Sequence, residues 1–294
     1  MINGILIIDK PQNYTSFDVI AILRKKFNQK KIGHMGTLDP MATGVLPILL
    51  GSAAKFQIYA PENIKEYICE IQFGTETDTW DIWGKIINQT NSNIKINNLE
   101  NILHKFIGDI KQVPPMYSAI KQNGVKLCNL ARQGIEIERP ARNIKIHNIN
   151  IMNFDAENQV AVLKILCSSG TYIRSLCHDL GQELNTCACM KNLKRTLSNS
   201  FDISQSVSLD NIKNLDLQEI INNHVLCTDK LFEHFEKINF NSEQLYSFKH
   251  GASIKFRDFD NYKNNILRVY FENDFVGLVQ IDRENNILKY LKAV

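Results

Sequence analysis

The stretch "GHMGTLDPMATG", residues 33–44, places a single carboxylate among glycines, small residues and apolar residues. That carboxylate belongs to Asp39, which Pro40 follows directly, and the apolar run "VLPILLG" comes next. Because Asp-Pro pairs are common in turns, a turn or a helix cap is one interpretation. The other interpretation is a carboxylate that the backbone holds in place for chemistry. The rest of the sequence favours the second.

Length and composition indicate a globular protein. The 294 residues are enough for one large domain, or for a large domain and a small one. The chain is 44% hydrophobic and 22% charged, which is typical of a protein with a large core. No apolar run is long enough for a membrane span, and the first residues show no secretory signal. The seven cysteines follow no regular spacing, so we expect a reduced, cytoplasmic protein.

Basic residues gather between residues 105 and 145, which we call the basic segment. Eight Lys and Arg residues stand there against three acidic ones: Lys105, Lys111, Lys121, Lys126, Arg132, Arg139, Arg142 and Lys145. Smaller basic clusters occupy residues 24–31 and 191–195. Such clusters suit the phosphates of a nucleic acid, and a solvated helix face is the alternative.

Hydrophobic periodicity predicts both strands and helices. Residues 4–10 and 64–73 are predicted strands, and the second of them alternates with Tyr67 and Cys69 on one face. Residues 159–167 are apolar almost throughout, which predicts a strand buried on both faces. Residues 16–27, capped by Thr15 or Ser16, and residues 173–184 have helical spacing, with Phe17 on the apolar face of the first. From about residue 238 the pattern changes to short strands and turns, which predicts a small all-β domain.

Motifs for nucleotide-driven chemistry and for metals are missing or weak. No glycine-rich phosphate or dinucleotide loop is present. Cys177, His178, Cys187 and Cys189 lie close in sequence, but their spacing matches no usual zinc site, and buried free thiols explain them better. A thiol enzyme that uses Cys177 or Cys187 is a further alternative, although adjacent side chains such as Cys177 and His178 diverge by about 100° on a helix.

Five segments in order resemble the bacterial tRNA pseudouridine-55 synthase family (TruB family) over essentially the whole chain. They are "DKP" at 9–11, "GHMGTLDPMATG" at 33–44, "TDTWD" at 77–81, "VPPMYSAIK" at 113–121 and "GTYIRSL" at 170–176. Asn13 stands where the family usually has Gly, and Asn tolerates a left-handed backbone better than most residues. Met35 and Thr37 replace commoner small or hydroxylated residues.

The resemblance implies an α+β fold. A pseudouridine-synthase catalytic domain, residues 1–237, would be built on a mixed, largely antiparallel sheet flanked by helices. A small all-β, PUA-like domain, residues 238–294, would bind RNA. The glycines of the 33–44 stretch would allow close approach of the RNA backbone, and Pro40 would stiffen the position of Asp39.

The resemblance also implies a reaction, the isomerisation of the uridine at position 55, in the T-loop of tRNA, to pseudouridine on a flipped-out base. Asp39 would attack the base or its ribose as the nucleophile, and Arg174 would pair with Asp39 and keep it ionised. Tyr67 would contact the target base and assist the final proton loss. Further matched positions line the uracil pocket or hold the RNA loop: Tyr172, Leu193 and His34. From the residues alone, core packing explains Tyr67 and Leu193 equally well, an unrelated ion pair explains Arg174, and a structural role explains His34.

All bonds in this reaction belong to one nucleotide, so no cofactor, metal or energy source is expected. The expected partner is the T-arm of tRNA, with its phosphates on the basic segment, and the protein would act as a monomer without an obligate protein partner or a membrane. Two alternatives share the motifs. One is a guide-RNA-dependent pseudouridine synthase, and the other is a non-catalytic tRNA-folding protein.

Overall fold

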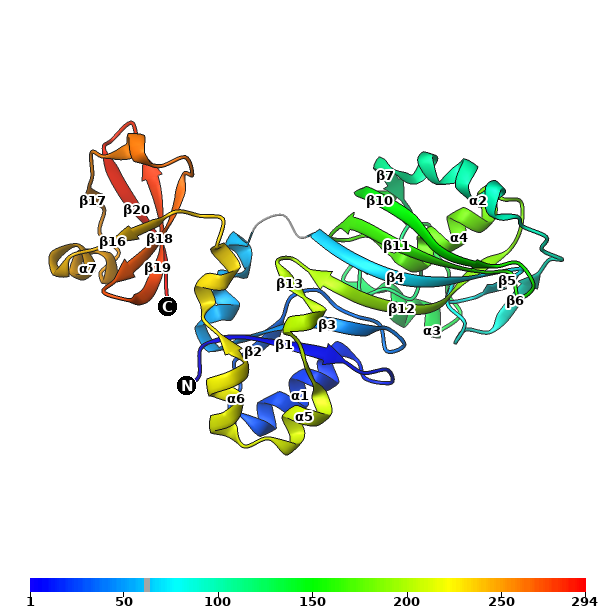
Figure 1. Cartoon of the computed structure of the whole chain (residues 1–294), viewed down its shortest axis with the longest axis horizontal. Coiled ribbons are helices and arrows are strands. Elements are labelled where there is room, and N and C mark those ends of the chain that lie inside the picture. Colours follow the sequence, from blue (N-terminus) through cyan, green and yellow to red (C-terminus); the bar gives the residue numbers. More distant parts are fainter. Residues whose placement is uncertain (61–63) are drawn as a thin grey trace.

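The structure is a computed structural model that describes residues 1–60 and 64–294 (Figure 1). Its main sheet has eleven strands, most of them in the order β14-β1-β3-β12-β4-β11-β10-β7, while β2, β13 and β15 pair with β3, β12 and β1. The strands are β1 (Gly4–Lys10), β2 (Ile32–His34), β3 (Thr43–Leu50), β4 (Ile64–Phe73), β7 (Gly108–Gln112), β10 (Arg142–Asp155), β11 (Val160–Ser168), β12 (Ala188–Ser198), β13 (Phe201–Asp202), β14 (Val207–Ser208) and β15 (Val225–Leu226).

The sheet is mixed and largely antiparallel, as the resemblance implies. Among its pairs only β1 with β14 and β3 with β12 are parallel in the part of the chain that the structure describes. Two short hairpins stand apart, β5 (Thr75–Thr77) with β6 (Ile86–Gln89), and β8 (Lys121–Gln122) with β9 (Val125–Lys126). The α+β fold class is therefore confirmed.

Helices lie at both ends of the sheet. Figure 1 shows α1 (Ser16–Lys26), α5 (Leu209–Asn214) and α6 (Leu217–His224) gathered beside β1, and α2 (Ile96–Leu103) and α4 (Ile173–Glu183) near β10 and β11. The remaining helices are α3 (Leu127–Arg132) and the 3-10 turns η1 (Gly51–Tyr59), η2 (His104–Phe106), η3 (Ile203–Gln205) and η4 (Thr228–Phe232). No helix among the described residues is long and apolar enough to cross a membrane.

Local rules explain where α1 begins and which face it buries. The Thr15 hydroxyl accepts a hydrogen bond from the Asp18 backbone N–H at 3.0 Å, and the Asp18 carboxylate accepts one from the Thr15 N–H at 2.8 Å. This capping box places Val19, Ile20 and Leu23 on the buried face. Phe17 was predicted on that face, but it is 65% exposed, because the second helical position points to solvent; the Arg24 guanidinium covers its ring.

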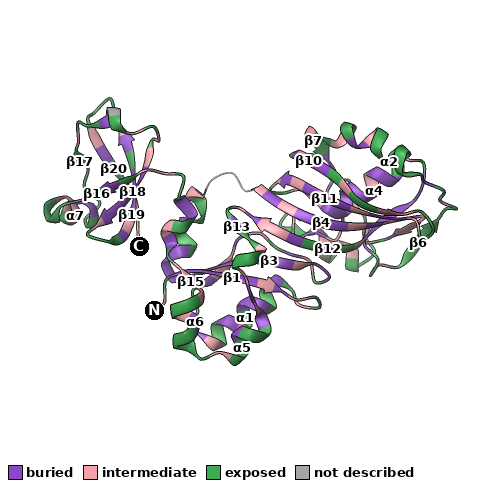
Figure 2. Ribbon diagram, in the orientation of Figure 1, coloured by how far each residue is buried: buried purple, intermediate pink, exposed green. Residues whose placement is uncertain are grey.

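Burial along the central strands follows the alternation of the sequence. On β4 every second residue is buried, as predicted, with Tyr67 and Cys69 on the same face. The prediction that β11 is buried on both faces is wrong, since Leu163, Ile165 and Cys167 are buried while Val162, Lys164 and Leu166 between and beside them are only partly covered. The reason is that the hydrophobic core to which α4 contributes covers one face of this part of the sheet. Figure 2 shows buried and intermediate residues alternating along these strands.

The C-terminal part is a separate five-stranded sheet in the order β16-β18-β19-β20-β17. Its strands are β16 (Lys237–Asn239), β17 (Ile254–Lys255), β18 (Ile266–Phe271), β19 (Asp274–Asp282) and β20 (Ile287–Ala293), with the 3-10 turn η5 (Phe259–Asn261). A helix, α7 (Ser242–Lys249), interrupts the predicted run of strands, because Asn241 and Gln244 form a capping box.

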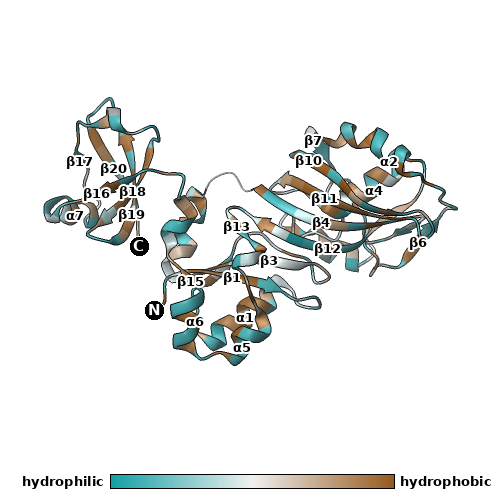
Figure 3. Cartoon of the chain, in the orientation of Figure 1, coloured by the Kyte–Doolittle hydropathy of each residue, from teal (hydrophilic) through white to brown (hydrophobic). Residues whose placement is uncertain are grey.

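The two parts share a hydrophobic contact. Phe56 of η1 and Phe232 of η4 pack against Phe275 of β19, with ring centroids 5.8 and 6.4 Å from the Phe275 ring. Ile5 and Ile7 of β1 belong to the same cluster, so β1 is covered on both faces. Hydrophobic residues accordingly concentrate on the strands of both sheets (Figure 3).

Candidate active site

Asp39 lies in the loop 35–42 between β2 and β3, which we call the Asp39 loop. Helix α1 holds this loop through Ser16, whose hydroxyl donates to the Leu38 carbonyl at 3.1 Å and accepts from the Leu38 N–H at 2.8 Å. The Asn13 N–H donates to the Pro40 carbonyl at 2.9 Å, and Asn13 has a left-handed φ of 69°, which the sequence allows there. The loop is therefore fixed on both sides of Asp39.

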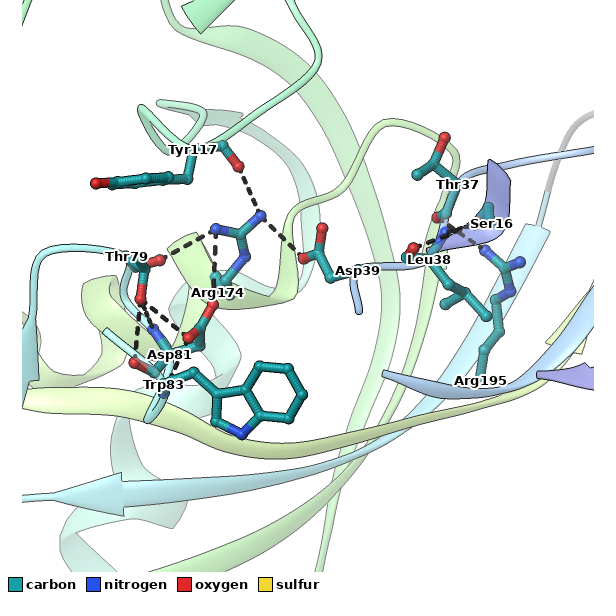
Figure 4. A network of polar contacts seen from close by, with 10 residues as sticks. All are labelled: Ser16, Thr37, Leu38, Asp39, Thr79, Asp81, Trp83, Tyr117, Arg174 and Arg195. Carbon is teal, nitrogen blue, oxygen red and sulfur yellow. Dashed lines mark hydrogen bonds and ion pairs between the residues drawn. The ribbon is translucent and has the colours of Figure 1, made fainter. Parts of the chain in front are cut away.

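Arg195 of β12 lies under the Asp39 loop, between this loop and the sheet, and is completely buried. Its Nε donates to the Val45 carbonyl at 2.7 Å, and its Nη2 donates to the Gly36 carbonyl at 3.0 Å. Its Nη1 donates to the Thr37 carbonyl at 3.4 Å (Figure 4). The sequence placed Arg195 in a basic cluster that would meet phosphates. That interpretation is wrong for Arg195, because its guanidinium is buried and donates its hydrogen bonds to backbone carbonyls.

Two glycines of the loop are required by protein atoms. A Cβ on Gly44 would lie 2.1 Å from the Arg195 carbonyl oxygen, and one on Gly36 would lie 2.7 Å from Lys65 Nζ. Both glycines also have positive φ values, 99° and 84°. The expectation that these glycines make room for RNA is therefore wrong for Gly36 and Gly44; they let the loop pack directly on β12 and β4.

Arg174 reaches Asp39 from the first turn of α4. Its Nη2 lies 2.9 Å from Asp39 Oδ2, and the Arg174 side chain is 5% exposed against 37% for Asp39. Arg174 also donates to the Thr79 carbonyl at 3.1 Å and to the Tyr117 carbonyl at 2.9 Å (Figure 4). A guanidinium fixed by two carbonyls is pre-organised for a carboxylate, and the exposed side of that carboxylate faces solvent.

A second carboxylate, Asp81, lies on the other side of Arg174 and was not predicted. Asp81 Oδ2 lies 3.8 Å from Arg174 Nη1, while Asp81 Oδ1 accepts hydrogen bonds from the Thr79 hydroxyl at 2.9 Å and from the Trp83 N–H at 3.1 Å. Burial raises the pKa of Asp81, and the nearby Arg174 charge opposes this. Asp81 is the last residue of the "TDTWD" motif, which is the only signal for it in the sequence.

Tyr67 and Leu193 lie on one face of the sheet with Arg195. Tyr67 of β4 is the cross-strand partner of Arg195, and Cys69 is the partner of Leu193, so all four side chains point to the same face. Tyr67 and Leu193 are buried. Burial raises the pKa of Tyr67, so its phenol is protonated at neutral pH, and the Asp39 charge acts in the same direction.

Tyr172 and His34 border the Asp39 loop from α4 and β2. The Tyr172 backbone exchanges two hydrogen bonds with the Gln112 side chain, at 2.8 and 3.0 Å, just before Arg174. Burial raises the pKa of Tyr172, and the Asp39 charge again contributes. Burial, with the charges of Arg195 and Lys65, lowers the pKa of His34, so its ring is neutral at pH 7. His34 Nδ1 is buried and has no hydrogen-bond partner among the described residues.

Two buried lysines complete the surroundings of the loop. Lys10 Nζ donates to the Tyr14 carbonyl at 2.7 Å and the Pro11 carbonyl at 2.9 Å, and burial lowers the pKa of Lys10 to about 8 against the pull of Asp39. Lys65 Nζ donates to the Ser198 hydroxyl at 2.9 Å, and burial and Arg195 lower the pKa of Lys65 to about 7. Lys10 belongs to the "DKP" motif, whereas nothing in the sequence marked Lys65.

The cysteines do not form a reactive or metal-binding site in the described part of the chain. No group of three or more His, Cys, Asp or Glu side chains there could hold a metal ion. Cys177 is buried, with its Sγ 3.5 Å from Cys69 Sγ, and burial raises its pKa. Cys187 is also buried, and His178 stacks on Trp80. The buried-thiol interpretation therefore holds, and a thiol nucleophile loses its support.

The basic segment presents free cations. Lys105, Arg139 and Lys145 form ion pairs with acidic neighbours. Within the described ranges the other five basic residues are exposed and form no ion pair: Lys111, Lys121, Lys126, Arg132 and Arg142. Unpaired surface cations of this kind suit a polyanion better than a self-neutralised helix face.

Comparisons with known proteins agree along the whole chain. The model of the TruB family pseudouridylate synthase N-terminal domain matches residues 24–173, and that of the tRNA pseudouridylate synthase B C-terminal domain matches residues 174–233. The tRNA pseudouridine synthase B of Clostridium tetani (strain Massachusetts / E88) is 43% identical over 293 residues, covering 98% of this chain and 99% of that protein. The protein of the same name from Fusobacterium nucleatum is 42% identical over 290 residues, with 98% and 99% covered.

Solved structures share the fold at low identity. A structure of an H/ACA RNP bound to a substrate RNA containing 2'-deoxyuridine superposes with a TM-score of 0.70 at 20% identity, covering 99% of this chain and 84% of that one. A Cbf5-Nop10-Gar1 complex gives 0.70 at 22% identity, with 99% and 84% covered. With two family models matching the consecutive segments 24–173 and 174–233, and relatives above 40% identity over nearly the full length, this chain belongs to the TruB family of pseudouridylate synthases.

Proposed function

We propose that this protein isomerises the uridine at position 55, in the T-loop of tRNA, to pseudouridine, with Asp39 as the nucleophile. The observation that carries the proposal is the contact of 2.9 Å between Arg174 and Asp39, on a loop fixed from both sides, with 37% of the Asp39 side chain exposed. A carboxylate held this way is oriented by a positive charge and open to a substrate. The relatives named tRNA pseudouridine synthase B support tRNA as the RNA.

In the proposed reaction an Asp39 carboxylate oxygen attacks the target nucleotide at its base or its ribose. The bond between N1 and C1' breaks, the uracil turns, and a bond between C5 and C1' replaces it. The bond between the nucleotide and the Asp39 oxygen breaks in turn, so the carboxylate is regenerated. The proton on C5 then leaves and N1 gains one, so the product is an isomer of the substrate. No electron or group from outside is consumed.

The remaining residues take roles that their surroundings support. We assign Tyr67, which is buried on the sheet face it shares with Arg195, to contact with the target base and to the final loss of the C5 proton. We assign Tyr172 and Leu193 to the walls of the uracil pocket. The His34 ring is neutral and the residue is partly exposed, which suits contact with an RNA loop from which one base has left its stack. Extracting that base costs a few kcal/mol, which phosphate contacts along the basic segment would offset.

We also propose that residues 1–237 form the catalytic domain, that residues 238–294 bind RNA, and that the protein acts as a monomer in the cytoplasm. The separate sheet and the separate hydrophobic cluster around Phe248 and Leu267 support the division. Action on free tRNA is supported by the contrast in identity, 43% with a protein named tRNA pseudouridine synthase B against 20% with an H/ACA RNP component.

The test uses the purified full chain alone with an unmodified tRNA transcript. After incubation, the nucleosides are analysed and the modified position is mapped; a transcript with cytidine at position 55 is the matched control. We expect pseudouridine at position 55 and none in the control. Product that forms only after guide RNA and partner proteins are added would instead support the guide-dependent alternative, and tRNA binding without product would support the folding protein.

A further inference from the structure

Two tryptophans lie three positions apart in the loop 78–85 between β5 and β6, and their surroundings differ. The Trp80 ring stacks on His178, with centroids 4.3 Å apart and planes 13° apart, and the Arg139 guanidinium lies 5.6 Å from its centroid. The Trp83 ring makes no such contact with any residue that the structure describes, and Trp83 is 51% exposed. The Trp80 indole therefore packs within the protein, whereas the Trp83 indole is exposed to solvent.

The loop nevertheless holds Trp83 firmly. Its backbone N–H donates to Asp81 Oδ1 at 3.1 Å, and the Gly84 N–H donates to the Asp81 carbonyl at 3.0 Å. The Thr77 hydroxyl donates to that same carbonyl at 2.6 Å. A Cβ on Gly84 would lie 2.2 Å from the Thr79 hydroxyl oxygen, so the turn packs closely against Thr79 at this position. A large apolar ring on a fixed backbone, with no intramolecular cover, is the usual form of a contact surface for a ligand.

Asp81 connects Trp83 to the catalytic carboxylate. Asp81 Oδ1 binds the Trp83 N–H, Asp81 Oδ2 lies 3.8 Å from Arg174, and Arg174 lies 2.9 Å from Asp39. Only the side chains of Asp81 and Arg174 separate the Trp83 backbone from Asp39. Figure 4 shows the Trp83 indole extending from its loop on the side of Arg174 where Asp39 lies. Because these contacts join the Trp83 backbone to Asp39, we expect an RNA whose target nucleotide reaches Asp39 to lie near this ring.

We propose that Trp83 is a stacking platform for an unpaired base of the substrate RNA next to the flipped nucleotide. The inference rests on the proposed function. When a nucleotide leaves the stack, its neighbours lose a partner, and an aromatic ring at a fixed position replaces that partner. Stacking is tolerant of sequence, because every base has a π-face, so Trp83 contributes affinity and positioning rather than base identity. Trp80, already stacked on His178, holds the loop.

The first test measures the dissociation constant of a T-arm stem-loop, with Asp39→Asn in every protein so that no chemistry intervenes. We expect Trp83→Ala to weaken binding roughly 5- to 150-fold, the loss of one base–aromatic stack, and Trp83→Phe to stay within a few-fold of the parent. The matched control is Ile86→Ala, an apolar residue of β6 that is 53% exposed and should have no effect. Equal affinity of Trp83→Ala and the parent would overturn the inference.

A second measurement does not depend on how Trp83→Ala folds. The chain has two tryptophans, so Trp80→Phe leaves Trp83 as the only indole and keeps a ring on His178. Saturating stem-loop should quench its fluorescence, and unchanged emission would contradict stacking. A parent that neither binds the stem-loop nor modifies tRNA would remove the proposed function together with this inference. If the parent binds the stem-loop and modifies tRNA, but Trp83→Ala binds equally well and the Trp83 emission does not change, only this inference is contradicted.

Discussion

Arg174 stands between two carboxylates that differ in every other respect. Asp39 lies 2.9 Å from the guanidinium, is 37% exposed, and has no other side-chain partner among the described residues. Asp81 lies 3.8 Å away, is 12% exposed, and accepts hydrogen bonds from the Thr79 hydroxyl and the Trp83 N–H. The Asp81 carboxylate accepts hydrogen bonds from its own loop, whereas Arg174 is the only side chain among the described residues that binds the Asp39 carboxylate. The same guanidinium thus supports one carboxylate that is structural and one that is available to react.

The difference separates positioning from chemistry. A carboxylate that satisfies buried donors cannot leave them without leaving those donors unpaired, which costs about 1–3 kcal/mol. A carboxylate with one ionic partner and an open side can approach a substrate while its charge stays balanced. We therefore expect substitutions of Asp39 and Asp81 to fail in different ways.

Asp39→Asn should have the largest effect on the reaction. An amide keeps the size and most hydrogen bonds of the carboxylate but cannot act as an anionic nucleophile. We expect no detectable pseudouridine by nucleoside analysis, and tRNA affinity within roughly 1 kcal/mol of the parent, because the positioning contacts lie elsewhere. A mere turn residue would accept Asn almost silently, since both are good turn residues.

Arg174→Met comes next. The side chain keeps its length, but Asp39 loses the partner that orients it, and the Asp81 charge loses its neighbour. We expect turnover to fall at least ~10²-fold while tRNA binding persists. Lys230→Met is the control, because Lys230 forms only an exposed ion pair with Glu233, and such pairs contribute little. Parental turnover in Arg174→Met would show that the contact with Asp39 is incidental.

Substitutions of Asp81 should lower the stability of the protein more than its turnover. Asp81→Ala removes the acceptor of the Trp83 N–H and the Thr79 hydroxyl, and we expect the free energy of unfolding to fall by about 1–3 kcal/mol. Asp81→Asn keeps an acceptor oxygen and should retain most of that stability, with turnover within about tenfold of the parent. Denaturant titration of the two variants measures the difference. Equal stability of Asp81→Ala and the parent would contradict the structural role.

The pH dependence of Asp81 has a defined sign. Because burial raises the pKa of Asp81 above its ordinary value of 3.8, the folded state binds this proton more tightly than the unfolded state. The resulting stabilisation is present below that value and is lost as the pH rises through the raised pKa. The parent should therefore lose stability relative to Asp81→Asn over this range. A constant difference between the two proteins, measured by unfolding titrations at several pH values, would argue against the burial effect.

The smallest expected effect lies away from both carboxylates. Lys121→Ala combined with Arg132→Ala removes two exposed, unpaired cations of the basic segment. We expect weaker tRNA binding and a plot of log affinity against log salt that is flatter by about one to two units of slope, with turnover at saturating tRNA preserved. An unchanged slope would mean that the basic segment is only a solvated face.

Much of the fold could be predicted from local patterns. The alternation along β4 and the cap at Thr15 correspond directly to what the structure contains. The strand pattern of the C-terminal part concealed α7, because its capping residues also occur in turns. The coverage of β11 was not predictable, since an apolar run does not show how many layers pack on it.

Only part of the candidate site could be predicted from the sequence. Motif resemblance indicated Asp39 and Arg174, and the structure brings them together. It assigned no role to Asp81, although Asp81 ends the "TDTWD" motif, or to Arg195, because a charged residue looks the same in sequence whether it lies on the surface or under a loop. Lys65 is the extreme case, a buried ammonium whose one hydrogen-bond acceptor, Ser198, is 133 positions away. Only the three-dimensional arrangement shows that these charges serve the Asp39 loop.

The most direct test of the division between the two carboxylates is a single-turnover measurement with enzyme in excess over an unmodified T-arm transcript. Asp39→Asn and Asp81→Asn are compared side by side with the parent. Both substitutions remove one negative charge next to Arg174 and keep the size of the side chain. We expect no pseudouridine from Asp39→Asn at any time point, and complete conversion by Asp81→Asn at a rate within about tenfold of the parent. Product from Asp39→Asn at near-parental rate, or none from Asp81→Asn, would contradict the assignment of the nucleophile.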